Sequence, residues 1–210
     1  MQYSEIISTA LAYADRTDNS VSSKVDMFLK IAESRINRYL TTQDMVLTSN
    51  TPIVADAFLY ALPSDFLMLR GISIKNNSDP KTSYQLSYVT PKLIEDIISI
   101  GISSSSYTMI GNSIKIASLP DTTDPTNNWV LEIDYYKNVP ALTSVNNENW
   151  LSILSPDTYV FGLMTEISAF VKDKDSAALW DTRFKNALDE LNSQDDLHLW
   201  AGPSINTMPG

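Results

Sequence analysis

The sequence lacks cysteine, has a single histidine (His198) and holds only six glycines in 210 residues. The absence of cysteine excludes disulfides and thiolate metal sites. One histidine excludes, within one chain, a histidine-dependent catalytic triad and a metal site with several histidine ligands. The sequence also contains no phosphate-binding loop, no dinucleotide-binding fingerprint and no Gly-x-Ser-x-Gly elbow. We therefore expect neither an enzyme nor a bound cofactor.

Basic residues are scarce, with 15 Lys and Arg against 25 Asp and Glu, for a net charge of −10. Residues 1–105 carry −2 of this charge and residues 106–210 carry −8. An acidic chain repels nucleic-acid phosphates, so tight nucleic-acid binding is not expected, although solubility alone explains the acidity equally well. The longest apolar run, residues 93–102, is interrupted by acids and a glycine, which excludes a membrane span. The first residues do not resemble a signal peptide.

Both ends of the chain show helical patterns. Apolar residues recur every three or four positions over residues 6–14, 25–40, 159–171 and 177–191. Ser155-Pro156-Asp157 adds a cap, a first-turn proline and an acid ahead of the third pattern. Amphipathic helices need partners to bury their apolar faces. We therefore expect the N-terminal and C-terminal helices to pack on each other.

The middle of the chain has short apolar runs between turn-forming residues, which is typical of strands. Residues 107–117 predict a hairpin around Gly111-Asn112, and residues 129–136 alternate as a half-buried strand does. One helix interrupts the strands, with Thr90 as its cap and Gly101 at its end. The predicted fold class is α+β: an antiparallel helical bundle (residues 1–44 and 150–192), an inserted small antiparallel β domain (45–149) and an extended C-terminal arm (193–210).

Carboxylates offer a few candidate sites. Glu132 and Asp134 share a strand face and could cleave a glycosidic bond if burial raised one pKa, but a solvated sheet face is the simpler explanation. Two pairs of acids could hold a hard cation such as Ca²⁺, yet their spacing lacks the calcium-loop pattern, so ordinary loop acids are favoured. These pairs are Asp121 with Asp124 and Asp173 with Asp175.

Aromatic and basic side chains offer further candidates. An aromatic platform for carbohydrate is one interpretation of four residues, and packing is the simpler one. They are Trp129, Tyr135, Tyr136 and Trp150. Arg35 and Arg38 could contact a partner, although a solvated helix face or ion pairs within the chain are favoured.

The last 18 residues, 193–210, mix apolar side chains with glycine and proline. A terminal tryptophan with neighbouring leucines is costly to expose, and tryptophan is enriched at binding hot spots. We therefore predict that this arm orders on a partner protein. The predicted interface residues are Leu197, His198, Leu199, Trp200, Ile205 and Met208.

Several segments, taken in order, resemble the head-to-tail adaptor (connector) proteins of short-tailed bacteriophages. Each segment is weak alone, and their order and spacing over nearly the whole chain carry the resemblance. The segments are Ala32-Glu-Ser-Arg-Ile-Asn-Arg38, Leu62-Pro-Ser-Asp-Phe-Leu-Met-Leu-Arg-Gly-Ile72, Tyr88-Val-Thr-Pro91, Leu131-Glu-Ile-Asp-Tyr-Tyr-Lys-Asn-Val-Pro-Ala-Leu142, Asn149-Trp-Leu-Ser-Ile-Leu-Ser-Pro-Asp-Thr-Tyr159 and Ala187-Leu-Asp-Glu-Leu-Asn192.

The resemblance implies a structural virion protein at the head–tail interface, assembled in the host cytoplasm. It implies a homo-oligomeric ring, usually of twelve copies, that joins the portal protein to a tail or nozzle protein. DNA would pass through the ring's channel without specific binding, and residues 197–210 would form the portal docking arm. Two alternatives stay open at this point. One is a phage tail component that binds or hydrolyses surface carbohydrate through the β insertion, and the other is a small cytosolic interaction module.

Overall fold

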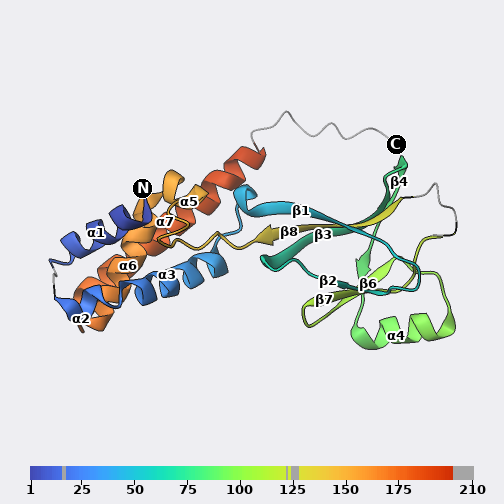
Figure 1. The fold of residues 1–210 in the computed structure, drawn as a ribbon, viewed down its shortest axis with the longest axis horizontal. Coiled ribbons are helices and arrows are strands. Elements are labelled where there is room, and N and C mark those ends of the chain that lie inside the picture. Colours follow the sequence, from blue (N-terminus) through green and yellow to red (C-terminus); the bar gives the residue numbers. More distant parts are fainter. Residues whose placement is uncertain (16–17, 122, 124–127, 201–210) are drawn as a thin grey trace. The chain divides into compact units, whose positions relative to one another are not determined.

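The computed structural model describes residues 1–15, 18–121, 123 and 128–200, with the backbone alone for residues 80, 81 and 195–200. The chain divides into two compact units (Figure 1). We call residues 1–44 with 139–210 the helical unit, and residues 45–138 the sheet unit. Each unit is described by itself below.

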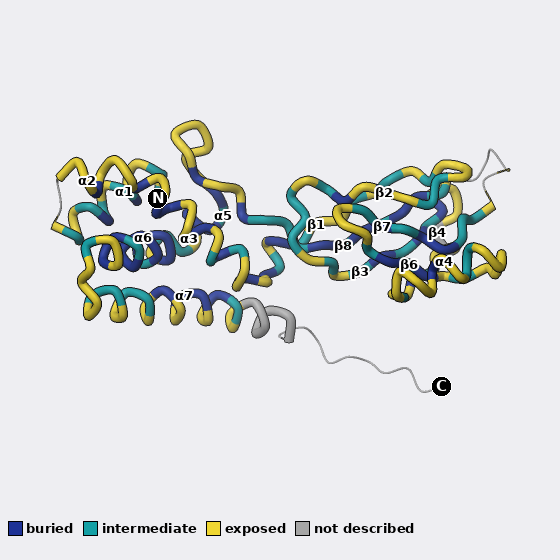
Figure 2. The backbone as a smooth tube through the Cα atoms, turned by 90° about the horizontal axis from the view of Figure 1, so that it is seen from below, coloured by how far each residue is buried: buried dark blue, intermediate teal, exposed yellow. Residues whose placement is uncertain are grey.

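The helical unit is built around α6, which contacts four other helices, α1, α3, α5 and α7. Figure 2 shows α6 buried along most of its length. Apolar residues stand on most faces of α6, so few of its faces can be left in water. The helices of this unit are α1 (Tyr3–Tyr13), α2 (Asn19–Ser22), α3 (Val25–Tyr39), α5 (Trp150–Leu154), α6 (Pro156–Phe170) and α7 (Lys174–Trp200).

Gly162 lets two helices approach α6 closely. A Cβ atom at this position would lie 2.9 Å from the Cβ of Ala32 on α3 and 3.2 Å from the ring of Phe184 on α7. Phe184 and Ala32 are both fully buried. Because Gly162 has no side chain, α3, α6 and α7 can meet at this point.

The sheet unit contains two four-stranded sheets, ordered β1-β8-β3-β4 and β2-β7-β6-β5. Their shared apolar core draws on both sheets, with Ile74 and Ile133 from the first and Ile114 and Ile116 from the second. The strands are β1 (Val46–Pro52), β2 (Leu59–Ala61), β3 (Phe66–Asn76), β4 (Asp79–Gln85), β5 (Ser87–Tyr88), β6 (Ser106–Ile110), β7 (Ser113–Ile116) and β8 (Trp129–Lys137).

Local signals in the middle of the chain are confirmed. The predicted hairpin is the antiparallel pair β6 and β7, with Gly111 at a φ of 59° in its turn. The predicted helix is α4 (Pro91–Ile100), where the Thr90 side chain accepts a hydrogen bond from the Leu93 N–H. Gly101 ends α4 in the left-handed conformation at a φ of 73°.

The predicted fold class was wrong in its account of the β region. The structure is α+β, but the strands form two four-stranded sheets rather than a small antiparallel domain inserted in a helical bundle. The sheets are not wholly antiparallel either, because β5 and β6 pair in parallel. A parallel pair needs a long crossover, and α4 supplies it.

The predicted extended arm was also wrong where the structure describes it. Helix α7 continues without a break through residues 193–200 to Trp200. Leucine and glutamine in this stretch are compatible with a helix, and Gly202 and Pro203 stand only after it. Among the described helices of both units, none has the length and apolar character needed to cross a membrane.

Candidate assembly site

Helix α7 carries the chain toward the predicted docking residues, and α3 holds it in place. The Arg35 guanidinium forms ion pairs with Asp181 of α7 and, at 3.4 Å, with Glu166 of α6. It also lies 4.8 Å from the ring centre of Phe184. Burial opposes ionisation of Asp181, but Lys185 and Arg35 outweigh it and lower the pKa of that carboxyl. Arg35 is therefore an ion-pairing residue within the chain.

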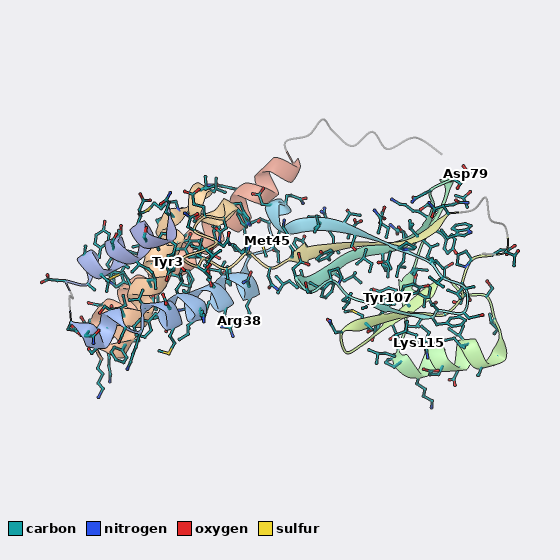
Figure 3. The ribbon with its side chains drawn as sticks, in the orientation of Figure 1. Tyr3, Arg38, Met45, Asp79, Tyr107 and Lys115 are labelled. Carbon is teal, nitrogen blue, oxygen red and sulfur yellow. The ribbon has the colours of Figure 1, made fainter. Side chains whose placement is uncertain are left out.

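A second group of contacts fixes α7 to α3 at positions one and two turns beyond Lys185. The Tyr39 hydroxyl donates to the Asp189 carboxylate. Asn192 accepts a hydrogen bond from the Thr41 N–H at 3.2 Å and donates one to the Tyr39 carbonyl at 3.2 Å. Arg38, by contrast, projects from the outer side of α3 and is exposed (Figure 3). Helix α7 is thus anchored to α3 as far as Asn192.

The predicted docking residues follow this anchor. The backbone at Leu197, His198, Leu199 and Trp200 is helical, and their side chains lie outside the described part of the chain. Ile205 and Met208 lie outside the described residues altogether. The structure thus describes the part of α7 from which the predicted docking segment starts.

The return segment, residues 139–149, is held against α3 by buried polar groups that sequence reasoning missed. The N–H of Val139 donates to the Asn37 side chain at 2.7 Å, and the N–H of Leu142 donates to the Glu33 carboxylate at 2.7 Å. The N-terminal segment joins them, because the N–H of Tyr3 donates to the Asn147 carbonyl at 2.8 Å. Hydrogen bonds as well as apolar packing therefore join the two stretches of chain that make up the helical unit, residues 1–44 and the stretch that begins at residue 139.

Asn149 links the return segment to α5 and α6. Its side chain accepts from the Ser152 N–H at 2.7 Å and so caps α5. Its amide also donates to the Pro140 carbonyl at 2.6 Å and to the Tyr159 hydroxyl at 2.7 Å. An asparagine three residues before a serine is a weak cap signal, and nothing in the sequence indicates the other two partners.

Glu33 is a carboxylate that is only 8% exposed. Burial raises its pKa above the ordinary glutamate value, and the Leu142 N–H and the Lys30 ammonium oppose that shift only in part. Between the ordinary glutamate pKa and the raised pKa of the folded protein, the folded state therefore binds more protons than the unfolded state. Stability falls as the pH rises through that window, and below the ordinary value the loss is absent.

Replacing Glu33 by glutamine is expected to remove this loss while keeping an oxygen acceptor for the Leu142 N–H. The melting temperature of Glu33→Gln should match the wild type in acid and rise above it at neutral pH. Glu33→Ala, which leaves the buried N–H unpaired, should instead cost about 1–3 kcal/mol in acid, where the wild-type carboxyl is protonated. Thermal melts over a pH series check both, and a constant offset between Glu33→Gln and the wild type would contradict the pKa argument.

The predicted carboxylate pair lies on the face of β8 opposite the core. Glu132 pairs with Lys75 of β3, and Asp134 accepts from the Thr48 hydroxyl at 2.5 Å. Lys75 of β3 thus neutralises Glu132, and Thr48 of β1 forms a hydrogen bond with Asp134. This arrangement matches a solvated sheet face and not an acid and base facing a shared substrate.

The four predicted aromatic residues do not form a platform. Tyr135 is 2% exposed and donates from its hydroxyl to Asp65 at 2.9 Å. Tyr136, the next residue, falls on the opposite sheet face. Trp129 donates to the Asp121 carbonyl at 3.0 Å, and Trp150 belongs to α5 of the other unit.

The predicted cation ligands serve as loop and cap residues where they are described. Asp121 accepts from the N–H and the hydroxyl of Thr123, and these bonds lower the pKa of its carboxyl. Asp173 accepts from the Ser176 N–H at 3.1 Å at the start of α7. Asp175 is exposed, and Asp124 lies outside the described residues. The described part of the chain has no cluster of three or more metal-ligating side chains.

In the helical unit, packed helices thus form a platform whose last helix, α7, is anchored to α3. A family model described as SU10 adaptor protein matches residues 1–207. The chain therefore belongs to the SU10 adaptor protein family, and it is a structural head-to-tail adaptor of a bacteriophage. No match was found among curated proteins.

Family membership sets the class of partner and the place of action. The family is one of structural adaptors and not a known enzyme family. It implies interaction with phage portal and tail proteins, and phage adaptors are components of the virion.

Proposed function

We propose that copies of this adaptor form a ring that connects the portal to the tail or nozzle and continues the DNA channel. The observation that carries the proposal is the family match over residues 1–207. We take twelve copies as the working number, as the resemblance implies. Copies in a ring are related by rotation, so each must present two different patches that fit one another.

The packing of the helical unit supports a docking role for the chain end. Asn192 and Asp189 fix α7 to α3, so the segment that follows starts from a rigid base. In the proposal, residues 193–210 bind the portal through the predicted interface residues. Many copies bind at once in a ring, and avidity makes the attachment effectively permanent.

Removing the arm is expected to abolish the portal complex. The wild-type chain mixed with purified portal rings should give a complex that survives size-exclusion chromatography, and a chain that lacks residues 197–210 should not. A full-length variant with serine at the five apolar arm positions tests side chains separately from chain length. These positions are Leu197, Leu199, Trp200, Ile205 and Met208.

The anchors of α7 lie at Asn192 and before, so both variants should melt like the wild type. Wild-type affinity for the portal in both variants would contradict the arm's role. Electron microscopy of the wild-type complex tests the ring itself, and a portal with scattered single copies would contradict it.

The proposed channel passes DNA without binding it. The net charge of −8 over residues 106–210 supports this, because acidic walls oppose adsorption of phosphates. In the proposal these acids face the channel. The assembly of portal and adaptor should therefore retain no DNA at physiological salt.

A further inference from the structure

Two strand edges of one sheet are open in the sheet unit. β1 is the outermost strand of its sheet and pairs with β8 alone. At the other side, β4 pairs with β3 only from Ser73 onward, and Leu86 donates to the Ile72 carbonyl just beyond. β4 then leaves this sheet, because β5 joins the second sheet. Within the described residues, Phe66–Leu69 therefore has a strand neighbour on the β8 side alone.

Both edges lack charged guards over the pairing stretch, although Pro52 ends β1 and two register shifts interrupt β3 against β8. Charged side chains, above all lysine, commonly block such edges. The sequence of β1 is Val-Leu-Thr-Ser-Asn-Thr-Pro and that of the open part of β3 is Phe-Leu-Met-Leu, so neither carries a charge. β1 also pairs with β8 without a bulge. In a chain of net charge −10, these are stretches where two copies can meet without like-charge repulsion.

A groove runs along the open part of β3. It has a volume of about 550 Å³, and Leu69 and Leu86 line it together with Tyr107 and Met109 of β6. Tyr107 is labelled in Figure 3. Met68, at the rim, is 44% exposed. Arg70 and Gln85 line the groove as well, so its lining is partly polar. An open edge beside such a groove accepts an extended strand, whose backbone pairs with the edge and whose alternate side chains enter the groove.

β1 matches this acceptor. Leu47 stands opposite Tyr135, so its side chain is on the core face of the sheet, yet it is 41% exposed. Leu69 also stands opposite Tyr135, so the groove opens on the same face. A β1 strand added beside β3 would place Leu47 toward the groove. β1 and β3 both run antiparallel to β8, so the added strand would lie parallel to β3.

We propose that β1 of one copy adds to the open edge Phe66–Leu69 of the next copy, which joins their sheets into one. The inference rests on the ring proposed above and names one of its contacts between neighbours. The two edges are different patches at opposite sides of β8, so the contact is heterologous and propagates from copy to copy until the ring closes. The two register shifts of β3 against β8 twist this edge, so the incoming strand must follow that twist.

The natural absence of cysteine allows a direct test by disulfide cross-linking. Thr48 of β1 and Met68 of β3 lie on the same outer sheet face and are both exposed. With β1 parallel to β3 and Leu47 at the groove, Thr48 is the β1 residue that falls beside Met68. The double variant Thr48→Cys/Met68→Cys is assembled on portal rings, oxidised and run on a non-reducing gel. A ladder of covalent oligomers is expected. The bond cannot close within one copy, because β8 separates the two positions by about 10 Å and a disulfide spans less than about 7 Å.

Three matched variants control the result. Thr48→Cys alone and Met68→Cys alone should give no ladder, and dimers from either would indicate symmetric edge pairing and overturn the proposal. Thr48→Cys with Ser99→Cys, an exposed position on α4, should remain monomeric on the gel. All variants replace exposed residues, and their melting temperatures should match the wild type.

Charge variants at the same two positions give a second measurement. Thr48→Lys/Met68→Lys places like charges across the proposed contact and should prevent ring formation, whereas Thr48→Lys/Met68→Glu should permit it. Rings of normal appearance without a ladder would overturn the edge contact and leave the ring intact. Portal-bound copies that form no rings would overturn the proposed function as well. Protection of the Phe66–Leu69 amides from hydrogen exchange only after a tail protein is added would assign the edge to that protein.

Discussion

Replacing Phe184 by alanine should lower the free energy of unfolding of the helical unit by about 3–5 kcal/mol. Phe184 is fully buried, its ring lies where the Gly162 side chain would be, and Arg35 stacks over it. Truncation leaves a cavity at the meeting point of three helices and deprives Arg35 of its aromatic partner. Urea denaturation followed by far-ultraviolet circular dichroism measures the loss.

Leu179→Ala is the matched control, since Leu179 lies on the same helix and is 52% exposed. Its change in stability should stay within about 0.5 kcal/mol. Similar losses for the two variants would mean that α7 does not pack on α6 through the Phe184 side. A weakened portal complex for Phe184→Ala, with full binding for Leu179→Ala, would in addition link the anchor of α7 to docking.

The helices could be predicted because their signals are local. Phe28 and Ile36 repeat at helical spacing and are both buried on α3. Thr90, Pro91 and Gly101 bound α4 where the structure has it. In each case neighbours along the chain decide the structure, and these neighbours can be read in order.

The sheets could be predicted only in part, because their pairings are remote. β8 pairs with β1 over seven residues from Val46 to Pro52, and the two strands lie far apart in the sequence. The parallel pair β5 and β6 involves residues Ser87 and Tyr88 alone, too short a stretch for any alternation to show. The open edge of β3 follows from where β4 leaves the sheet at Leu86, which no local pattern indicates.

The candidate site likewise has local features that could be predicted and remote contacts that could not. The docking residues at the chain end were predicted from composition and stay a prediction. The polar contacts at Glu33 and Asn37 were missed, because each joins groups more than 100 positions apart along the chain, such as Glu33 and Leu142 at a separation of 109. A buried glutamate on a helix looks like a surface residue until its partner is known.

Asn149→Ala should cost about 2–4 kcal/mol, the second large effect. The variant loses the cap of α5, worth about 1 kcal/mol. It also leaves the buried Tyr159 hydroxyl and the part-buried Pro140 carbonyl without their donor, and a buried group that loses its partner costs about 1–3 kcal/mol. Tyr159 is fully buried, and this burial raises the pKa of its phenol. Urea denaturation at neutral pH gives the loss.

Asn146→Ala tests whether burial makes the difference. The Asn146 amide donates to the Ala141 carbonyl at 2.8 Å, a bond of the same type in the same segment, but it is exposed to water. Water can replace the lost donor there, so the cost should be below about 1 kcal/mol. Equal losses at the two positions would show that the return segment is held by its chain path and not by the buried network. A large loss at Asn149 alone would establish that network as the link between α3, α5 and α6.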